Sequence, residues 1–205
     1  TLSPGMSAGT LTVSEGTDDT GSIVLGSSSE SLFELDTPTG TNDQVVMTNA
    51  DLVLDGTLVV EDLGGMAVGD VFTLFDLTDG TTTGAFAAVN NRTRYFGAVS
   101  IGDAGEDGQV NDVLLTLTGE AIMGDVNKDG KVDGLDLTAL AGSWDANDAQ
   151  WVDGDLTGDG NVDGLDLTAL AGNWDAVANG PIPEPATLAL LSLGGAALLR
   201  RRRRS

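Results

Sequence analysis

The sequence contains no cysteine and no histidine. Without cysteine the chain forms no disulfide and offers no thiolate nucleophile, and without either residue it builds no Cys/His zinc site. A catalytic triad that needs an imidazole base is excluded for the same reason. Carboxylate chemistry and metals that prefer oxygen ligands remain.

Basic residues are also scarce, at nine against 32 acidic residues. Five of the nine are the arginines at 200–204, so residues 1–199 carry 32 acids against four bases. Such a negative chain repels nucleic acids and anionic surfaces, and it attracts divalent cations. We therefore expect no nucleic-acid partner.

Aromatic residues make up only 4% of the chain, whereas glycine occurs 29 times, which favours a β-rich fold with many turns. Short apolar runs recur about every ten residues, and this spacing predicts a β-sandwich or a parallel β-solenoid. Asp55-Gly56 separates two of the runs and fits either a hairpin turn or a solenoid corner. The predicted strands lie at 10–13, 22–25, 32–35, 44–47, 51–54, 57–60, 71–75 and 113–117.

The segments SPGMSAGTLTV, SLFELD, DLVLDGTLVVE and GDVFTLFD resemble the terminal rungs of autotransporter-associated β-strand repeat proteins, over about the first 90 residues. The resemblance implies the end of a right-handed β-solenoid stalk that begins before Thr1. No basic segment followed by an apolar run opens the chain, so we expect a C-terminal piece of a longer precursor.

A duplication begins at residue 124, where GDVNKDGKVDGLDLTALAGSWD recurs from residue 154 as GDLTGDGNVDGLDLTALAGNWD, with 17 of 22 positions identical. A chain that coils around calcium offers oxygens from loop positions 1, 3, 5, 7, 9 and 12, with a glycine at position 6. We therefore predict two calcium ions rather than two solvated acidic loops. The first ion is assigned to Asp125, Asn127, Asp129, Lys131, Asp133 and Asp136, and the second to Asp155, Thr157, Asp159, Asn161, Asp163 and Asp166.

Three further expectations follow from these loops. Like charges repel, so without calcium we expect the module to be largely unfolded, with binding and folding as one event. Thr157 offers a neutral oxygen where the first loop has Asn127, so we expect the second site to be weaker. Val132 and Val162, at position 8, are expected to join the two loops by a short antiparallel β contact.

Each loop is followed by a pattern typical of an amphipathic helix. Leu137, Leu140, Ala141 and Trp144 follow the spacing i, i+3, i+4, i+7, which predicts one buried face. The second copy repeats this face at Leu167, Leu170, Ala171 and Trp174. Glycines follow the alanines at Gly142 and Gly172, and they indicate close approach to another backbone.

A calcium loop with one exiting helix, used twice and closed by aspartate at position 12, resembles a type I dockerin. The resemblance implies a small all-α module and a cohesin-like partner. It also implies partner contacts at Gly134, Leu135, Gly164 and Leu165, although these helices can instead pack against each other. Because the two helices are nearly identical, either can face the partner, in orientations related by about a half turn.

The last 25 residues differ in kind. Pro183, Glu184 and Pro185 precede the apolar stretch 186–199, which we expect to form a single hydrophobic helix before the arginines. This order resembles the PEP-CTERM sorting signal, which implies a transient stay at the inner membrane and cleavage by an exosortase-type enzyme. The alternative is an ordinary C-terminal membrane anchor.

We divide the chain into a β-rich stalk (1–120), a tandem calcium-binding module (121–178) and a sorting signal (179–205). The leading hypothesis is an exported, non-catalytic surface or extracellular protein that docks a partner in calcium and is linked to polysaccharide-degrading assemblies. One alternative is the C-terminal part of a dockerin-bearing glycoside hydrolase, whose catalytic domain would precede residue 1. Another is a calcium-stabilised adhesin.

Overall fold

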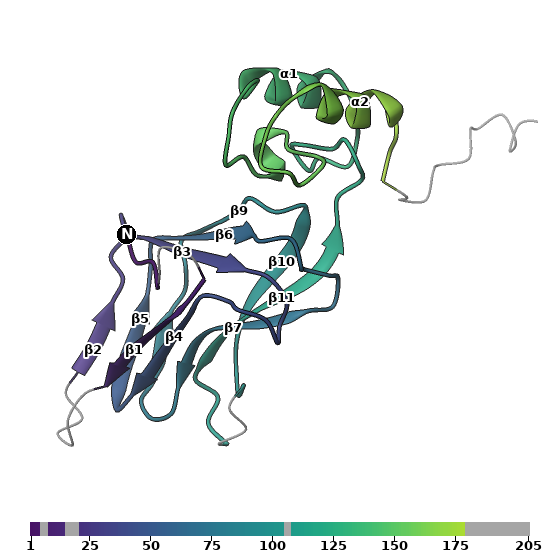
Figure 1. The fold of residues 1–205 in the computed structure, drawn as a ribbon. Helices are drawn as coiled ribbons and strands as arrows, with labels where there is room; N and C mark the ends of the chain where they lie inside the picture. Colours follow the sequence, from purple (N-terminus) through teal and green to yellow (C-terminus); the bar gives the residue numbers. More distant parts are fainter. Residues whose placement is uncertain (5–7, 15–20, 105–107, 179–205) are drawn as a thin grey trace, which may run out of the picture.

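The computed structural model describes residues 1–4, 8–14, 21–104 and 108–178, and Figure 1 shows strands first and helices afterwards. The strands are β1 (Thr10–Ser14), β2 (Gly21–Val24), β3 (Glu30–Leu35), β4 (Gln44–Thr48), β5 (Ala50–Leu54), β6 (Thr57–Asp62), β7 (Val71–Leu77), β8 (Thr82–Gly84), β9 (Ala88–Asn91), β10 (Tyr95–Gly102) and β11 (Asp112–Glu120). The helices are α1 (Gly134–Gly142), the short 3-10 helix η1 (Trp151–Asp153) and α2 (Gly164–Gly172).

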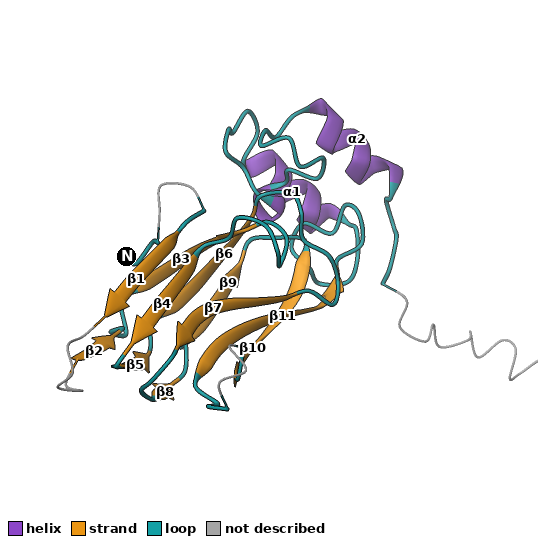
Figure 2. Cartoon of the chain, turned by 60° about the horizontal axis from the view of Figure 1, so that its bottom comes forward, coloured by secondary structure: helices purple, strands orange, loops and turns teal. Residues whose placement is uncertain are grey.

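Strands β1 to β9 form three successive coils of three strands each, which we call the coil stack. Each strand pairs in parallel with its equivalent in the next coil, which gives the ladders β1-β4-β7, β2-β5-β8 and β3-β6-β9 (Figure 2). The antiparallel strands β11 and β10 then extend the first ladder beyond β7. A sandwich would join neighbouring strands by antiparallel hairpins, so the sandwich alternative is wrong.

The core of the coil stack follows from the alternation of side chains along its strands. In β3, for example, every second residue is buried, and Phe33 and Leu35 are completely covered. Phe33 meets Phe75 of β7 edge to face, with ring centroids 5.3 Å apart. Stacking the coils therefore places equivalent apolar positions above one another in one continuous core.

Asp55-Gly56 forms a corner between two consecutive strands of one coil. It is not a hairpin turn, because β5 and β6 lie in different ladders and do not pair with each other. Gly56 has φ of +74°, and a Cβ there would lie 2.4 Å from the carbonyl oxygen of Ser29. The Asp55 carboxylate accepts a hydrogen bond from the Gly56 N–H at 2.7 Å. Both the left-handed backbone and the close approach therefore require glycine at this corner.

Residues 121–178, which we call the loop module, have a core separate from that of the coil stack. Figure 1 shows the loop module in green at one end of the strands. Each of its loops begins against the opposite helix: a Cβ on Gly154 would lie 2.8 Å from the Cα of Leu140, and one on Gly124 would lie 3.3 Å from the Cα of Leu170. The close backbone approach predicted for Gly142 and Gly172 is wrong, since a Cβ at either position would meet nothing within 4 Å.

The prediction of a small all-α module is wrong. Each helix spans only nine residues, and the chain between and after the helices consists mainly of turns and loops, with the short 3-10 helix η1. Isolated antiparallel β-bridges join Lys131 to Val177 and Asn147 to Asn161. The helices are short because each ends at its glycine, where the Ser143 or Asn173 N–H bonds back to the carbonyl of Leu140 or Leu170.

The prediction of a single C-terminal hydrophobic helix is also not supported. Among the described residues, no helix is both long enough and apolar enough to cross a membrane. The tail on which this prediction falls, 179–205, lies outside the described residues.

Candidate metal centre

The first predicted calcium loop is wound around the carboxylate of Asp125. Its two oxygens accept hydrogen bonds from the backbone N–H groups of Asp129, at 3.0 Å, and Gly130, at 2.9 Å. The Asn127 amide oxygen accepts from the Asp129 N–H at 2.8 Å, and Asp129 accepts from the Lys131 N–H at 3.0 Å. Gly130 turns the chain with φ of +86°, as predicted for the sixth position. Local side chains thus fold the first half of the loop back toward its start.

Asp136 ties the end of this loop to its beginning. Its carboxylate accepts hydrogen bonds from the N–H groups of Asn127, at 3.1 Å, and Asp133, at 2.8 Å. Asp133 in turn accepts from the Leu135 N–H at 2.8 Å, which completes a capping box at the start of α1. The predicted ligand Asp133 is therefore also the N-cap of the helix.

The second loop repeats most of this arrangement. Asp155 accepts hydrogen bonds from the N–H groups of Gly158, at 2.7 Å, and Gly160, at 2.8 Å. Asp166 accepts from the N–H groups of Thr157, at 3.0 Å, and Asp163, at 2.8 Å. The Thr157 hydroxyl donates to Asp155 at 3.3 Å, whereas Asn127 at the same loop position accepts from the backbone.

The first and last aspartates of both loops are buried, and among the described residues none of them pairs with a lysine or arginine. Asp125, Asp136 and Asp166 are fully covered, and Asp155 is 5% exposed. Burial raises the pKa of Asp125, and the charges of Asp136 and Asp129 raise it further against the hydrogen bonds from the loop backbone. A buried carboxylate without a counter-charge is costly, so this donor set fits a hard divalent cation such as calcium.

The structure does not gather all the predicted ligands. Across the described part of the chain, no three acidic side chains form a group that could hold a metal by themselves. The predicted sets do not consist of acids alone, because they include the Asn127 amide, the Thr157 hydroxyl and the backbone carbonyls of Lys131 and Asn161. The structure shows how the backbone of each loop is wound, and the assignment of the metal ligands stays a prediction.

The predicted contact between the two loops at Val132 and Val162 is wrong. Val132 instead exchanges hydrogen bonds with the segment after α2, through the Ala176 carbonyl at 2.9 Å and the Asp175 N–H at 3.0 Å. Val162 does the same with the segment after α1, through the Ala146 carbonyl at 3.1 Å. Each loop is therefore held by the chain that leaves the opposite helix.

The helix faces also differ from the prediction. Of Leu137, Leu140, Ala141 and Trp144, only Leu140 is buried, and its buried neighbour on α1 is Asp136. Trp144 lies beyond the end of the helix and is 45% exposed. The hydrophobic spacing predicted that all four apolar side chains are buried, whereas the helix buries Leu140 together with Asp136 of the calcium loop.

The predicted partner-contact positions are exposed to solvent. Leu135 is 63% exposed and Leu165 is 61% exposed, and both glycines beside them, Gly134 and Gly164, are exposed as well. Other exposed apolar side chains recur at equivalent positions of the two copies: Leu137 and Leu167, and Ala141 and Ala171, on the helices, and Trp144 and Trp174 just beyond them.

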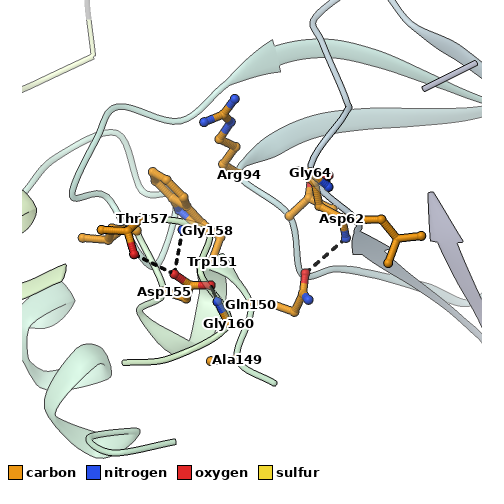
Figure 3. A pocket seen from close by; sticks show the side chains of 13 residues that line it. Asp62, Gly64, Arg94, Ala149, Gln150, Trp151, Asp155, Thr157, Gly158 and Gly160 are labelled. Carbon is orange, nitrogen blue, oxygen red and sulfur yellow. Dashed lines mark hydrogen bonds between the residues drawn. The ribbon is translucent and has the colours of Figure 1, made fainter. Parts of the chain in front are cut away.

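Sequence reasoning missed the role of Trp151 in the connector between the two copies. Its indole N–H donates to the Asp125 carbonyl at 2.8 Å, and its ring is buried in the core of the loop module. The neighbouring Gln150 accepts from the N–H of Asp62 in the coil stack at 3.1 Å (Figure 3). The connector at 145–153 is mostly polar, and its single tryptophan was the feature of the sequence that indicated a buried, packed segment.

Lys128 was missed too, although it lies inside the first loop. Its ammonium donates to backbone carbonyls of the coil stack, and burial lowers its pKa to about 8 against the opposing effect of Asp125. At neutral pH it is therefore still largely charged. A cavity of about 270 Å³ lies nearby, between the second loop and the coil stack, and Figure 3 shows Asp155, Trp151 and Arg94 among its lining residues.

Comparison with known proteins places two families on the chain. The family model of the dockerin type I domain matches residues 123–173, and that of the PEP-CTERM protein-sorting motif matches residues 181–204. No curated protein and no solved structure matches the chain. The resemblance of the first 90 residues to autotransporter-associated repeats stays a prediction. The chain therefore carries a dockerin type I domain in its loop module, followed by a PEP-CTERM protein-sorting motif.

Proposed function

We propose that this chain is an exported, non-catalytic protein in which the coil stack acts as a stalk and the loop module, with two calcium ions, docks a cohesin-like partner. The dockerin type I domain supports calcium-dependent protein docking, and the sorting motif supports an exported or cell-surface location. A role in a polysaccharide-degrading assembly is part of the proposal and rests on the dockerin resemblance alone.

The observation that carries the proposal is the set of exposed apolar side chains that recurs on α1 and α2 and just beyond their ends. Leucine, alanine and tryptophan side chains stay open to solvent there, although the spacing is that of a buried helix face. Groups of exposed apolar side chains mark sites of protein interaction. The two copies are exposed to almost the same degree, so the coil stack blocks neither helix from a partner.

Docking in either orientation predicts a particular mutational pattern. Leu135→Ala or Leu165→Ala alone is expected to leave capture largely intact, because the other helix remains able to face the partner. The double variant is expected to lose at least about ten-fold in affinity, as truncation of central apolar contacts usually does. The measurement is capture of a recombinant type I cohesin module, and of exported proteins from the parent cell, with calcium and with chelator.

Val110→Ala is the matched control, because Val110 is 72% exposed and lies outside the loop module. It should leave capture unchanged. If the double variant captures as much as the wild type, the helix surface is not the docking site. If nothing is captured even in calcium, the adhesin alternative replaces docking.

For the tail, we propose transient association with the inner membrane followed by cleavage near Pro183-Glu184-Pro185 by an exosortase-type enzyme. The match to the sorting motif at 181–204 supports this order. Mass spectrometry of the exported protein is expected to find a C-terminus near the Pro-Glu-Pro segment, without the arginines. An intact arginine tail on exported protein would reject processing and favour an ordinary anchor.

A further inference from the structure

The two calcium loops are near-duplicates, but they differ at the fourth loop position, where Lys128 corresponds to Gly158. Both residues have a left-handed backbone, with φ of +59° and +77°. Glycine adopts this conformation freely, whereas it strains a lysine. The first loop thus has a strained residue at a position where the second loop has an unstrained glycine. In return, the first loop carries a long basic side chain at that position.

This side chain leaves the loop and reaches the coil stack. The Lys128 ammonium donates to the carbonyls of Asn91 and Thr93, each at 2.6 Å, and lies 3.5 Å from the carbonyl of Tyr95. These three oxygens belong to the turn that joins β9 to β10. An ammonium has three N–H donors, and the turn supplies three acceptors for them.

The turn is already shaped to present these carbonyls. The Asn91 side chain accepts from the Thr93 N–H at 3.1 Å and hydroxyl at 2.8 Å, and it donates to the Tyr95 carbonyl at 3.0 Å. The Thr93 hydroxyl also accepts from the Tyr95 N–H at 3.0 Å. A site held by its own hydrogen bonds loses little entropy when the lysine binds.

A second set of contacts fixes the same face of the loop module. Arg92, from the same turn, pairs with Asp153 of the connector at 2.6 Å and also with Glu61 of β6. The connector returns to the first loop through Trp151, whose indole holds the Asp125 carbonyl. The coil stack therefore contacts the first loop both directly and through the connector.

The second loop has no equivalent attachment. Gly158 carries no side chain, and none of the described hydrogen bonds of this loop reaches the coil stack. On its side of the interface the cavity separates Thr157 and Gly158 from Asp62 and Arg94. The two copies thus differ in sequence at the fourth loop position, and they also differ in their contacts: the first loop binds the coil stack through Lys128, and the second does not.

We propose that the first calcium loop is also the site by which the loop module docks onto its own coil stack, so that calcium binding there and attachment of the module stabilise each other. The proposal rests on calcium binding by this loop. Coupling of two binding events is reciprocal. Attachment should therefore tighten calcium in the first loop, and removal of calcium should release the module from the stalk.

The test uses the full chain with Lys128→Gly, which installs the residue of the second copy and also relieves the backbone strain. Trp144→Phe and Trp174→Phe leave Trp151 as the single tryptophan, so its fluorescence follows calcium titration at the first loop. We expect about ten-fold weaker calcium binding, the factor for losing hydrogen bonds from a charged donor. Removing a positive charge beside Asp125 would by itself strengthen calcium binding, so the expected change has the opposite sign to simple electrostatics.

Attachment is measured separately as a distance between spin labels. The chain has no cysteine, so Thr83→Cys on β8 and Ala171→Cys on α2, both exposed, give two unique labelling sites. In calcium, Lys128→Gly is expected to broaden a distance distribution that is narrow in the wild type. Arg94→Gln is the control: it removes a positive charge from the same region of the coil stack without contacting the loop, and it should keep calcium affinity within about two-fold.

Weaker calcium binding together with a broader distance distribution supports the proposal. Unchanged values in both measurements overturn it, and so does either change without the other, because linkage requires both. If the wild type itself binds no calcium, the proposed function fails at an earlier step. The two failures are therefore distinguishable.

Discussion

Removing calcium with a chelator is expected to unfold the loop module while the coil stack stays folded. The two parts have separate cores, and that of the coil stack is formed by large side chains such as Phe33, Phe75 and Leu74. The core of the loop module is smaller, with three valines, three leucines, two alanines and Trp151 packed around buried aspartates. Without a cation, like charges about 4 Å apart repel by about 1 kcal/mol in water and about 4 kcal/mol at an effective dielectric of 20.

The raised pKa of Asp125 points in the same direction. A carboxylate whose pKa is higher in the folded than in the unfolded state stabilises the fold below its ordinary value of 3.8, and this contribution is lost as pH rises through the folded-state pKa. Without calcium, this carboxylate is buried beside other acidic groups and has no opposite charge, and only hydrogen bonds from the loop backbone oppose the cost of ionising it. Calcium supplies the opposite charge, which is why folding and binding are expected to occur together.

The natural tryptophans make this measurement selective, because Trp144, Trp151 and Trp174 all lie in the loop module. Trp151 is only 5% exposed, so chelation is expected to shift its emission to the red as the ring meets water. Far-UV circular dichroism should lose the weak helical contribution and keep the β signal of the coil stack. Native-like helicity and unshifted emission in chelator would show that the module folds without calcium.

The sequence predicted those features that depend on neighbours along the chain. All eight predicted apolar runs overlap strands, because alternation and turn residues are local signals. It missed three strands, β8, β9 and β10: β8 (TTG) and β9 (AVNN) are short and mostly polar, and the apolar residues of β10 (YFGAVSIG) are interrupted by glycine, alanine and serine, with most of their side chains exposed. The aspartate spacing likewise predicted the winding of both loops, since Asp125 and Asp136 bond to backbone groups within about ten residues.

Features that depend on distant contacts were not predictable in this way. The buried helix face was assigned by hydrophobicity, yet Asp136 is buried and Leu137 is exposed, because the loop draws its closing aspartate inward. The partners of Val132 lie more than forty residues away, after the second helix. Lys128 and Asn91 are separated by 37 residues, and no periodicity links them. Residues of this kind carry the attachment of the loop module to the coil stack.

Asp136→Asn is expected to abolish tight calcium binding by the first loop, and Asp166→Asn should do the same to the weaker second loop. Asparagine preserves the shape but replaces one carboxylate oxygen with an amide N–H₂, which faces a backbone donor and cannot accept from it. Loss of one hydrogen bond to a charged acceptor costs about 1.5 to 3 kcal/mol, or about ten- to a hundred-fold in affinity, before the lost attraction for calcium is added.

Isothermal titration calorimetry of the two variants separates the sites. Each is expected to bind one calcium ion, and Asp136→Asn should keep only the weaker event because Thr157 offers a poorer donor set than Asn127. Asp148→Asn is the control, since it removes an exposed acid of the same module at a left-handed position that asparagine tolerates. Two full calcium equivalents in Asp136→Asn would show that the twelfth position is not a ligand. In that case, its buried carboxylate would serve only to hold the loop backbone together.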